Sequence, residues 1–416
     1  MANTLALNGG NKAVVVPVPH YTWPQITDKT RNAVLSQIDE SISIYDRSGI
    51  IKVLEDRLAN YHGKKHALLT NSGTSALHSM YVGANLKEDD EVICPAYTFY
   101  ATVTPLFFTG AVPILADCNE DGNISPAEIE RRITPLTKAV VVTHMWGVPC
   151  DMDAITTLAK KHNLMVFEDA SHAHGAIYKG RKAGTFGDAS SFSMQAQKTL
   201  AAGEGGFLLT DNDDIFNRAL MLGHYNKRCK KEIPADNPLY AFGATGMGLK
   251  LRIHPVAAAI ANEQFDSLEQ VLSGRRQIAR IMSEELSSLP GIRVPEPSVD
   301  KSNSWYAFVM QYDGEQLGGL PIDKFHKALV AEGCLELDRP GSTAPLNTHP
   351  LFQKPWELFP GYSGKFSYMP GDFPCAEKFC KQALKLPVWH KPEDEPLVRQ
   401  YINAFRKVVD NHKELL

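Results

Sequence analysis

The sequence predicts an α/β fold, in which a mainly parallel sheet flanked by helices is followed by a smaller α+β domain. Three observations predict it. Short apolar runs rich in Val, Ile and Leu alternate with helical segments between residues 60 and 215. A long helix with an apolar face is predicted over Pro255–Leu272. Beyond about Ser273, helical stretches mix with short strands and with a Pro/Gly-rich region over Arg339–Pro374.

The predicted elements follow in chain order. Strands are expected at His66–Thr70, Glu91–Cys94, Val112–Leu115, Ala139–His144, Leu164–Phe167, Ser191–Met194 and Gly206–Thr210. Helices are expected at Thr74–Ala84, Ser125–Arg132 and Met152–His162, and later at Gln277–Leu289 and Ile322–Glu332. We therefore expect an N-terminal arm over residues 1–30, a large α/β domain over 31–272 and a smaller domain over 273–416.

Composition excludes several classes of protein. The 416 residues carry 43 basic and 47 acidic side chains, a net charge of −4, so the broad basic field of a nucleic-acid coat is missing. No apolar run approaches the roughly 18 residues that span a membrane. The segment Met1–Val14 does not resemble a secretory signal, and the seven cysteines form no CxxC pair. We expect a soluble cytoplasmic protein with no nucleic-acid or membrane partner.

The first of four motifs that carry candidate chemistry is Asn71–Leu77 (NSGTSAL), which follows an apolar run and opens a helical segment. Gly73 allows close backbone approach. The first-turn amides and the hydroxyls of Thr74 and Ser75 form a potential anion cradle. An ordinary N-cap by Ser72 or Thr74 produces the same pattern, so phosphate binding and simple capping both stay open.

The second motif is Val166–Gly175 (VFEDASHAHG), at the end of a predicted buried strand. A carboxylate there is costly unless it is paired, so Glu168 or Asp169 requires a partner, such as a protonated heterocyclic nitrogen. His172 and His174 are compatible with metal chelation, but no Cys or third His stands nearby at ligand spacing. Hydrogen-bonded packing of the histidines is the simpler interpretation, and we predict no metal site.

The third motif is Ser191–Gly206, in which Lys198 lies among small and apolar residues and close to glycines. Desolvation lowers the pKa of a lysine and makes its neutral amine a nucleophile. Taken alone, however, the segment better fits a lysine whose ammonium reaches solvent. The fourth motif, Gly248–Pro255, places Lys250 and Arg252 just before the predicted long helix. These two cations could bind an anion or an acidic partner, and a solvated basic loop is equally consistent with the sequence.

The order and spacing of the motifs match the requirements of a pyridoxal-phosphate site. An anion cradle binds the phosphate, and an aromatic residue of Pro95–Phe99 stacks on the pyridine ring. A carboxylate keeps the ring nitrogen protonated, and a lysine forms the covalent link and moves the proton. The 29-residue interval from Asp169 to Lys198 leaves room for one connection and one further strand. Both side chains can therefore reach the same edge of a sheet.

With these motifs in this order, the sequence resembles the DegT/StrS-type sugar aminotransferases, which are pyridoxal-phosphate-dependent transferases of fold type I. The resemblance extends from about Ile50 to the C-terminus. The matching stretches are Asn71–Leu77, Cys94–Ala101, Thr137–Asp153, Glu168–Ala176, Gly184–Lys198 and Gly203–Gly206. It implies an aminotransferase of amino-sugar or aminocyclitol biosynthesis in secondary metabolism, and a homodimer whose active sites are shared between subunits.

The resemblance also implies roles for individual residues. Lys198 corresponds to the lysine that carries the cofactor as an internal aldimine, Asp169 to the partner of the pyridine nitrogen, and His172 to a residue near the cofactor's phenolic oxygen. Further cofactor contacts are expected from Gly73, Thr74, Ser75, Phe99, Ser193 and Lys250. Lys250 stands where the family more often has an asparagine that contacts the phosphate bound by the other subunit. Expected loop ends supply the candidate substrate contacts Tyr45, Trp146, Tyr225 and His349.

The implied reaction moves an amino group from glutamine or glutamate to a ketone with ping-pong kinetics. Two alternatives stay open. The first is a sugar dehydratase, since some relatives have this activity. Those relatives carry His in place of the lysine, so Lys198 argues against a dehydratase. A cofactor-binding regulator without turnover is the other, although no helix-turn-helix or basic arm accompanies the motifs.

The acceptor is less well defined by the sequence. The family uses nucleotide-linked ketosugars and ketocyclitols (inososes), and it includes aminohydroxybenzoate synthases. His172 in place of the commoner Gln, together with the run Gly203–Gly206 (GEGG), favours a cyclitol-like acceptor by analogy.

Overall fold

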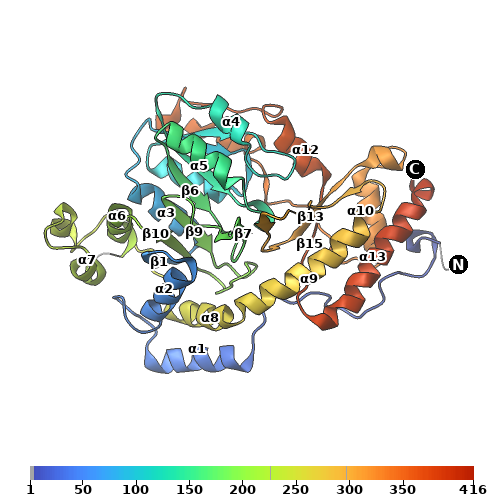
Figure 1. The fold of residues 1–416 in the computed structure, drawn as a ribbon, viewed down its shortest axis with the longest axis horizontal. Coiled ribbons are helices and arrows are strands. Elements are labelled where there is room, and N and C mark those ends of the chain that lie inside the picture. Colours follow the sequence, from blue (N-terminus) through green and yellow to red (C-terminus); the bar gives the residue numbers. More distant parts are fainter. Residues whose placement is uncertain (1–3, 225, 297) are drawn as a thin grey trace.

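A seven-stranded sheet forms the centre of the computed structural model, which describes residues 4–224, 226–296 and 298–416 (Figure 1). Its strands lie in the order β1-β10-β9-β6-β5-β2-β4. Their bounds are β1 His66–Thr70, β2 Glu91–Pro95, β4 Val112–Ala116, β5 Thr137–Thr143, β6 Met165–Asp169, β9 Ala189–Ser193 and β10 Gly206–Thr210. Strand β10 pairs antiparallel with β1 and β9, and the other pairs are parallel. The predicted mainly parallel sheet is confirmed, with strand ends that differ from the prediction by at most two residues.

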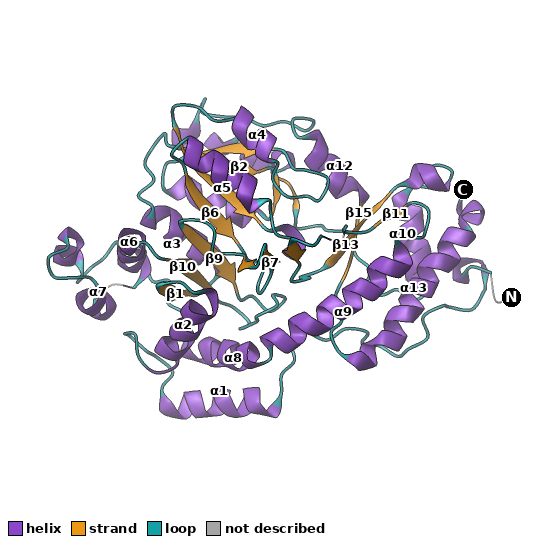
Figure 2. Ribbon diagram, viewed as in Figure 1, coloured by secondary structure: helices purple, strands orange, loops and turns teal. Residues whose placement is uncertain are grey.

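Helices cover both faces of this sheet (Figure 2). The helices of the first part of the chain are α1 Asp28–Glu40, α2 Gly49–His62, α3 Gly73–Gly83, α4 Pro126–Arg131, α5 Met152–Lys161, α6 Asp213–Gly223, α7 Lys227–Glu232 and α8 Pro255–Asp266, of which α1 packs on α8 and α7 on α6. Successive side chains of a strand point to opposite faces. Ala139 and Val141 of β5 accordingly join the core that contains α3 and α6, whereas Val140 and Val142 join the core that contains α4 and α5.

A second, antiparallel sheet lies in the C-terminal part of the chain. It consists of β11 (Ile292–Arg293), β13 (Phe308–Tyr312) and β15 (Ala383–Leu386). The helices of this part are α9 Leu268–Leu286, α10 Ile322–Ala331, α11 Pro350–Gln353, α12 Pro374–Gln382 and α13 Glu395–Asp410. The sheet shares a core with α9, α10 and α13, and Leu5 and Val14 of the N-terminal segment pack into it. Both chain ends lie beside this second core (Figure 1).

The predicted long helix over Pro255–Leu272 is interrupted, because the structure has α8 and α9 separated at Ser267. Helix α9 then continues through Gly274, which lies between the predicted helices Pro255–Leu272 and Gln277–Leu289. A Cβ atom at Gly274 would lie 1.8 Å from the carbonyl oxygen of His390, so the glycine permits close packing of backbone on backbone. The predicted domain boundary at 272/273 falls inside α9, and the three predicted domain ranges stay predictions.

Two small sheets connect the C-terminal part to the first part of the chain. Strand β12 (Lys301–Ser302) pairs with β7 (Ile177–Tyr178), which also pairs with β8 (Arg181–Lys182). Strand β14 (Ala344–Pro345) pairs with β3 (Tyr97–Thr98). Residues after 300 therefore return to segments that follow β2 and β6 of the central sheet. Over the described ranges, no helix has the length and apolar composition needed to cross a membrane.

Candidate active site

One edge of the central sheet collects the predicted site residues. In the sheet register, Asp169 at the end of β6 lies opposite Thr143 at the end of β5. Ser193 at the end of the adjacent strand β9 pairs with Gly206, which in turn pairs with Thr70 at the end of β1. Helix α3 begins shortly after β1 at this same edge. Carboxyl ends of parallel strands are where α/β sheets most often bind ligands.

One hydroxyl group and one backbone amide hold the buried carboxylate of Asp169. The Thr102 hydroxyl donates to Oδ2 at 2.7 Å, and the Ser171 amide donates to Oδ1 at 3.1 Å. The Thr102 hydroxyl also lies 2.8 Å from that of Thr98 and 3.3 Å from that of Thr143, all buried. The carboxylate is therefore held in place from one side and keeps acceptor capacity for a further donor.

The neighbouring Glu168 is held by four donors, as the sequence requires of a buried carboxylate. His144 Nε2 donates to Oε2 at 3.0 Å, and the Cys150 amide donates to His144 Nδ1 at 3.1 Å, which fixes the tautomer. The other donors, each at 2.7 Å, are the amides of Gly184, Phe186 and Gly187. Burial raises the pKa of Glu168, but the bonds from His144 and the amides outweigh it and hold the pKa below its usual value.

Lys198 is half-buried and follows the end of β9. Burial lowers the pKa of its amine to about 8, while the charge of Asp169 acts in the opposite direction. Its Nζ lies 4.5 Å from the centroid of the Tyr306 ring. The indole of Trp23, in the N-terminal segment, donates to the carbonyl oxygen of Lys198 at 2.9 Å. The environment is that of a desolvated amine rather than of a lysine extended into solvent.

His172 stacks on Tyr306, with ring centroids 4.0 Å apart and planes inclined by 13°. The ring of Trp146 lies 5.5 Å from that of His172. Burial, and then the charge of Lys198, hold the pKa of His172 well below its usual value, so the imidazole is neutral. Its buried Nδ1 has no hydrogen-bond partner among the residues that the structure describes. A buried polar atom without a partner is a candidate ligand contact.

The first predicted motif is capped and also shaped for an anion. Ser72 caps α3, since its hydroxyl accepts from the Ser75 amide at 3.0 Å, and the Ser75 hydroxyl donates to Asn71 Oδ1 at 2.6 Å. A Cβ atom at Gly73 would lie 2.6 Å from Cβ of Ser193, so only glycine lets β9 approach this helix so closely. First-turn amides lack intrahelical acceptors and stabilise a nearby anion.

The remaining predicted cofactor residues lie around this edge. Thr74 is exposed on the first turn of α3. Phe99 is half-buried in the segment that carries the threonine partner of Asp169. Lys250 is exposed, and its neighbour Leu251 accepts a hydrogen bond from the Asn71 amide at 2.7 Å. The Gly248–Arg252 segment thus passes the start of α3.

The candidate substrate residues that the structure describes do not form one group. Trp146 belongs to the stack beside His172. His349 is half-buried and follows β14, which pairs with the strand just before Phe99. Tyr45 is exposed, and the guanidinium of Arg252 lies 5.4 Å from its ring centroid. Tyr225 falls outside the described residues.

Sequence reasoning missed several residues that shape this site. Thr102, Trp23 and Tyr306 carry no local motif, and each reaches the site from a different part of the chain. Arg275 is buried, and its guanidinium donates to the Thr199 hydroxyl at 2.9 Å, directly after Lys198. The one available signal was the Arg275-Arg276 pair on the apolar-faced helix α9, where a buried cation is unusual.

These features fit pyridoxal phosphate. The first turn of α3 offers a phosphate its remaining amides beside Gly73, since Ser72 caps only the amide of Ser75. Asp169 offers a buried carboxylate to a ring nitrogen, and the unpartnered Nδ1 of His172 offers a contact to a ring oxygen. Lys198 supplies an amine with a lowered pKa. Across the described residues, no cluster of three or more His, Cys, Asp or Glu side chains is arranged to bind a metal.

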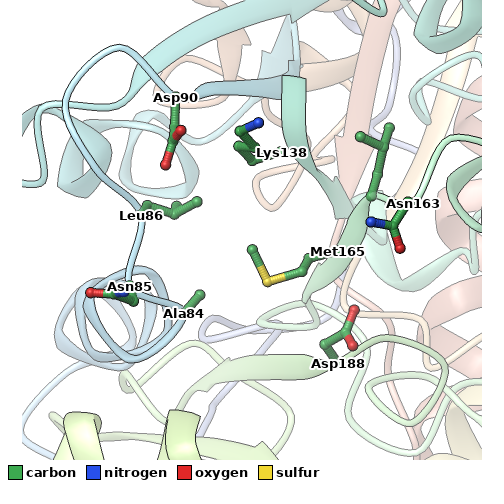
Figure 3. Close-up of a pocket in the computed structure, with 9 residues that line it drawn as sticks. Ala84, Asn85, Leu86, Asp90, Lys138, Asn163, Met165 and Asp188 are labelled. Atoms are coloured by element: carbon green, nitrogen blue, oxygen red, sulfur yellow. The ribbon is translucent and has the colours of Figure 1, made fainter. Parts of the chain in front are cut away.

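A surface cavity of about 390 Å³ lies at the opposite edge of the sheet (Figure 3). Its walls include Lys138 near the start of β5, Met165 at the start of β6, and Asp188 just before β9. The strands enter the sheet there, so this cavity is separate from the edge that carries Asp169.

Comparison with known proteins identifies the family. Residues 25–404 match the DegT/DnrJ/EryC1/StrS aminotransferase family. The chain is 32% identical to L-glutamine:2-deoxy-scyllo-inosose aminotransferase of Streptomyces kanamyceticus, over 84% of this chain and 83% of that one. It is 30% identical to GDP-perosamine synthase of Escherichia coli O157:H7, over 93% and 98% respectively.

Solved structures agree with the sequence comparison. The crystal structure of DesI in the presence of its TDP-sugar product is similar, with a TM-score of 0.78 and 28% identity, covering 100% of this chain and 98% of that one. The match therefore includes both the central sheet and the C-terminal part. The chain belongs to the DegT/DnrJ/EryC1/StrS family, and it is a pyridoxal-phosphate-dependent aminotransferase.

Proposed function

We propose that the enzyme transfers an amino group from glutamine or glutamate to a ketone of a cyclitol or of a nucleotide-linked sugar, with pyridoxal phosphate bound covalently to Lys198. The observation that carries this proposal is the amine of Lys198, whose pKa is lowered to about 8 and is influenced by the charge of Asp169. The lowered pKa gives the amine a substantial neutral fraction near pH 7, and the neutral amine is the nucleophile that such a link requires.

Each side chain at this edge of the sheet has a different proposed role in the reaction. Pyridoxal phosphate, when bound, supplies an electron sink for the α-carbon of the donor. Asp169, held by Thr102, keeps a proton on the ring nitrogen. His172 contacts the ring oxygen, and Lys198 forms the covalent link and carries the proton in each half-reaction. The residues proposed to bind the phosphate and the ring face are Gly73, Thr74, Ser75, Ser193 and Phe99.

Two acceptor classes are consistent with the relatives, one of which is named for an inosose and another for GDP-perosamine. Of the two we favour the cyclitol, on the analogy drawn from His172 and from the run Gly203–Gly206. Trp146 and His349 are the proposed acceptor contacts near the edge that carries Asp169, and Tyr45 is a proposed contact from a more distant loop. Tyr225, which lies outside the described residues, stays a proposed contact on the sequence alone.

The test is a screen of ketone acceptors with glutamine or glutamate as the donor. We expect amination of an inosose, detected by mass spectrometry of the product, and ping-pong patterns in the initial rates. The Lys198→Ala variant is the control and should produce no aminated product. Amination of a nucleotide-linked ketosugar alone would contradict the cyclitol preference, and no amination of either class would contradict the proposed function.

We also propose that two copies of the chain complete each other's sites. Lys250 is exposed, and the same loop exposes the apolar side chains of Phe242, Met247 and Leu249, which favour burial against a partner. In the proposed dimer, Lys250 contacts the phosphate that is bound mainly by the other subunit. A charge-assisted contact of this kind contributes about 1.5–3 kcal/mol, so Lys250→Ala should weaken cofactor affinity about 10- to 100-fold.

Mixing variants tests the sharing directly. A hybrid of Lys250→Ala and Lys198→Ala subunits has one site with both defects and one site with neither. Activity above that of either parent is therefore expected once subunits exchange. No recovery despite demonstrated exchange, or a monomer at working concentration, would contradict the shared site.

A further inference from the structure

Tyr306 contacts two of the residues proposed to carry the chemistry. Its ring centroid lies 4.5 Å from Nζ of Lys198 and 4.0 Å from the centroid of His172. The residue follows β12, far from every motif in the sequence, and the proposed function gives it no role.

The segment that carries Tyr306 is fixed on both sides. The Ser304 amide donates to the carbonyl oxygen of Gly147 at 3.0 Å, and the Ser304 hydroxyl donates to that of His172 at 2.7 Å. A Cβ atom at Gly147 would lie 2.3 Å from the Ser304 hydroxyl oxygen, so the contact requires glycine there. From the other side, Arg275 donates to the carbonyl oxygen of Trp305 at 3.2 Å. The ring is therefore held in place independently of Lys198.

The positive charge of the Lys198 ammonium needs a stabilising partner whenever the lysine is not linked to the cofactor. With a pKa of about 8, about nine in ten amines are protonated at pH 7. Among the described residues, no carboxylate lies within 4 Å of Nζ, so no direct ion pair neutralises the charge. The face of an aromatic ring attracts an ammonium through its quadrupole.

We propose that Tyr306 receives the free amine of Lys198: its ring binds the ammonium whenever the lysine is not linked to the cofactor and keeps it within reach of the reacting atoms. Its part in turnover rests on the proposed function, in which Lys198 is released and linked again in every cycle. The contact itself does not rest on it. The stacked imidazole of His172 and the fixed Ser304 segment keep the ring in one orientation for this purpose.

Two substitutions separate the ring from its hydroxyl. Tyr306→Phe keeps the ring face, and Tyr306→Leu fills the space with an apolar side chain that has no quadrupole. A cation–π contact stabilises the protonated amine and so raises the pKa of Lys198. Its loss should therefore lower that pKa by about half a unit to one and a half units in Tyr306→Leu, whereas Tyr306→Phe should stay close to the wild-type value.

The pKa of Lys198 is measured on the full-length protein without cofactor, by competitive acetylation at a series of pH values and quantification of the labelled peptide by mass spectrometry. The unfolding midpoint shows that each variant folds. If Tyr306→Leu does not fold, Tyr306→Met offers a similar volume without a ring. A pKa in the Leu or Met variant equal to that of Tyr306→Phe would overturn the proposal.

A second readout concerns turnover. After a single donor half-reaction and addition of a keto acid at pH 7, the loaded enzyme should regain the absorbance of its lysine-bound form about 3- to 8-fold faster in Tyr306→Leu than in Tyr306→Phe, because the lower pKa of Lys198 leaves a larger fraction of the amine neutral and able to attack. An equal rate in the two variants would overturn the role in turnover. If Lys198 is not the cofactor lysine, this absorbance is missing in wild type as well, whereas the labelling result is unaffected, so the two failures are distinguishable.

Discussion

The pH dependence of cofactor capture follows from the burial of Lys198. Only the neutral amine attacks the carbonyl carbon of pyridoxal phosphate. Burial lowers the pKa of this amine from 10.5 to about 8. At pH 7 the neutral fraction is then about one in ten, against about one in 3,000 for an exposed lysine, which is roughly a 300-fold difference.

The assay mixes cofactor-free enzyme with pyridoxal phosphate and follows the absorbance of the lysine-bound form by stopped flow. The rate should rise with pH and level off with a midpoint near 8. The charge of Asp169 raises the pKa of Lys198, so Asp169→Asn should move the midpoint below that of wild type. A rate that still rises tenfold per unit between pH 9 and 10 would refute the argument from burial.

Two further predictions concern the carboxylates of β6. Asp169→Asn should slow the donor half-reaction by at least about 10²-fold in single-turnover absorbance measurements, while cofactor affinity falls less because the phosphate cradle is intact; an unchanged rate would exclude the proposed role at the ring nitrogen. Glu168→Gln should lower the free energy of unfolding in urea by about 2–5 kcal/mol, because the single oxygen of an amide side chain cannot accept from His144 and from all three backbone amides that now donate to the carboxylate. A loss below about 1 kcal/mol would contradict this. Since the folded-state pKa of Glu168 is lowered, its contribution is present above the unfolded value of 4.5 and is lost as the pH falls below it.

The central sheet was predictable because its evidence is local. Runs such as His66–Thr70 and Gly206–Thr210 are short, apolar and bounded by polar or glycine residues, and both match strands in full. The course of helix α9 through Gly274 was not predictable, because its cause lies far away in the chain. Glycine usually marks the end of a helix, but at this position it accommodates the backbone near His390, which is more than a hundred residues away in the chain.

Some residues of the candidate site could also be predicted from the sequence, and others could not. The sequence predicted Asp169 and Lys198 from the order and spacing of the motifs and from the family resemblance, and the sheet register and the charge coupling between the two side chains place them in one region of the fold. It did not predict Tyr306, Thr102 or Arg275. These side chains act through contacts that depend on how distant segments pack, and only Arg275 has a signal in its own neighbourhood, the Arg275-Arg276 pair on an apolar-faced helix.

The covalent attachment of pyridoxal phosphate to Lys198 is the central claim, and one measurement tests it most directly. The loaded enzyme is reduced with borohydride, digested, and analysed by peptide mass spectrometry. We predict a single modified peptide that carries the reduced cofactor on Lys198, with none recovered from Lys198→Ala. Cofactor on a different lysine of the wild-type enzyme, or no covalently bound cofactor after reduction, would contradict the account.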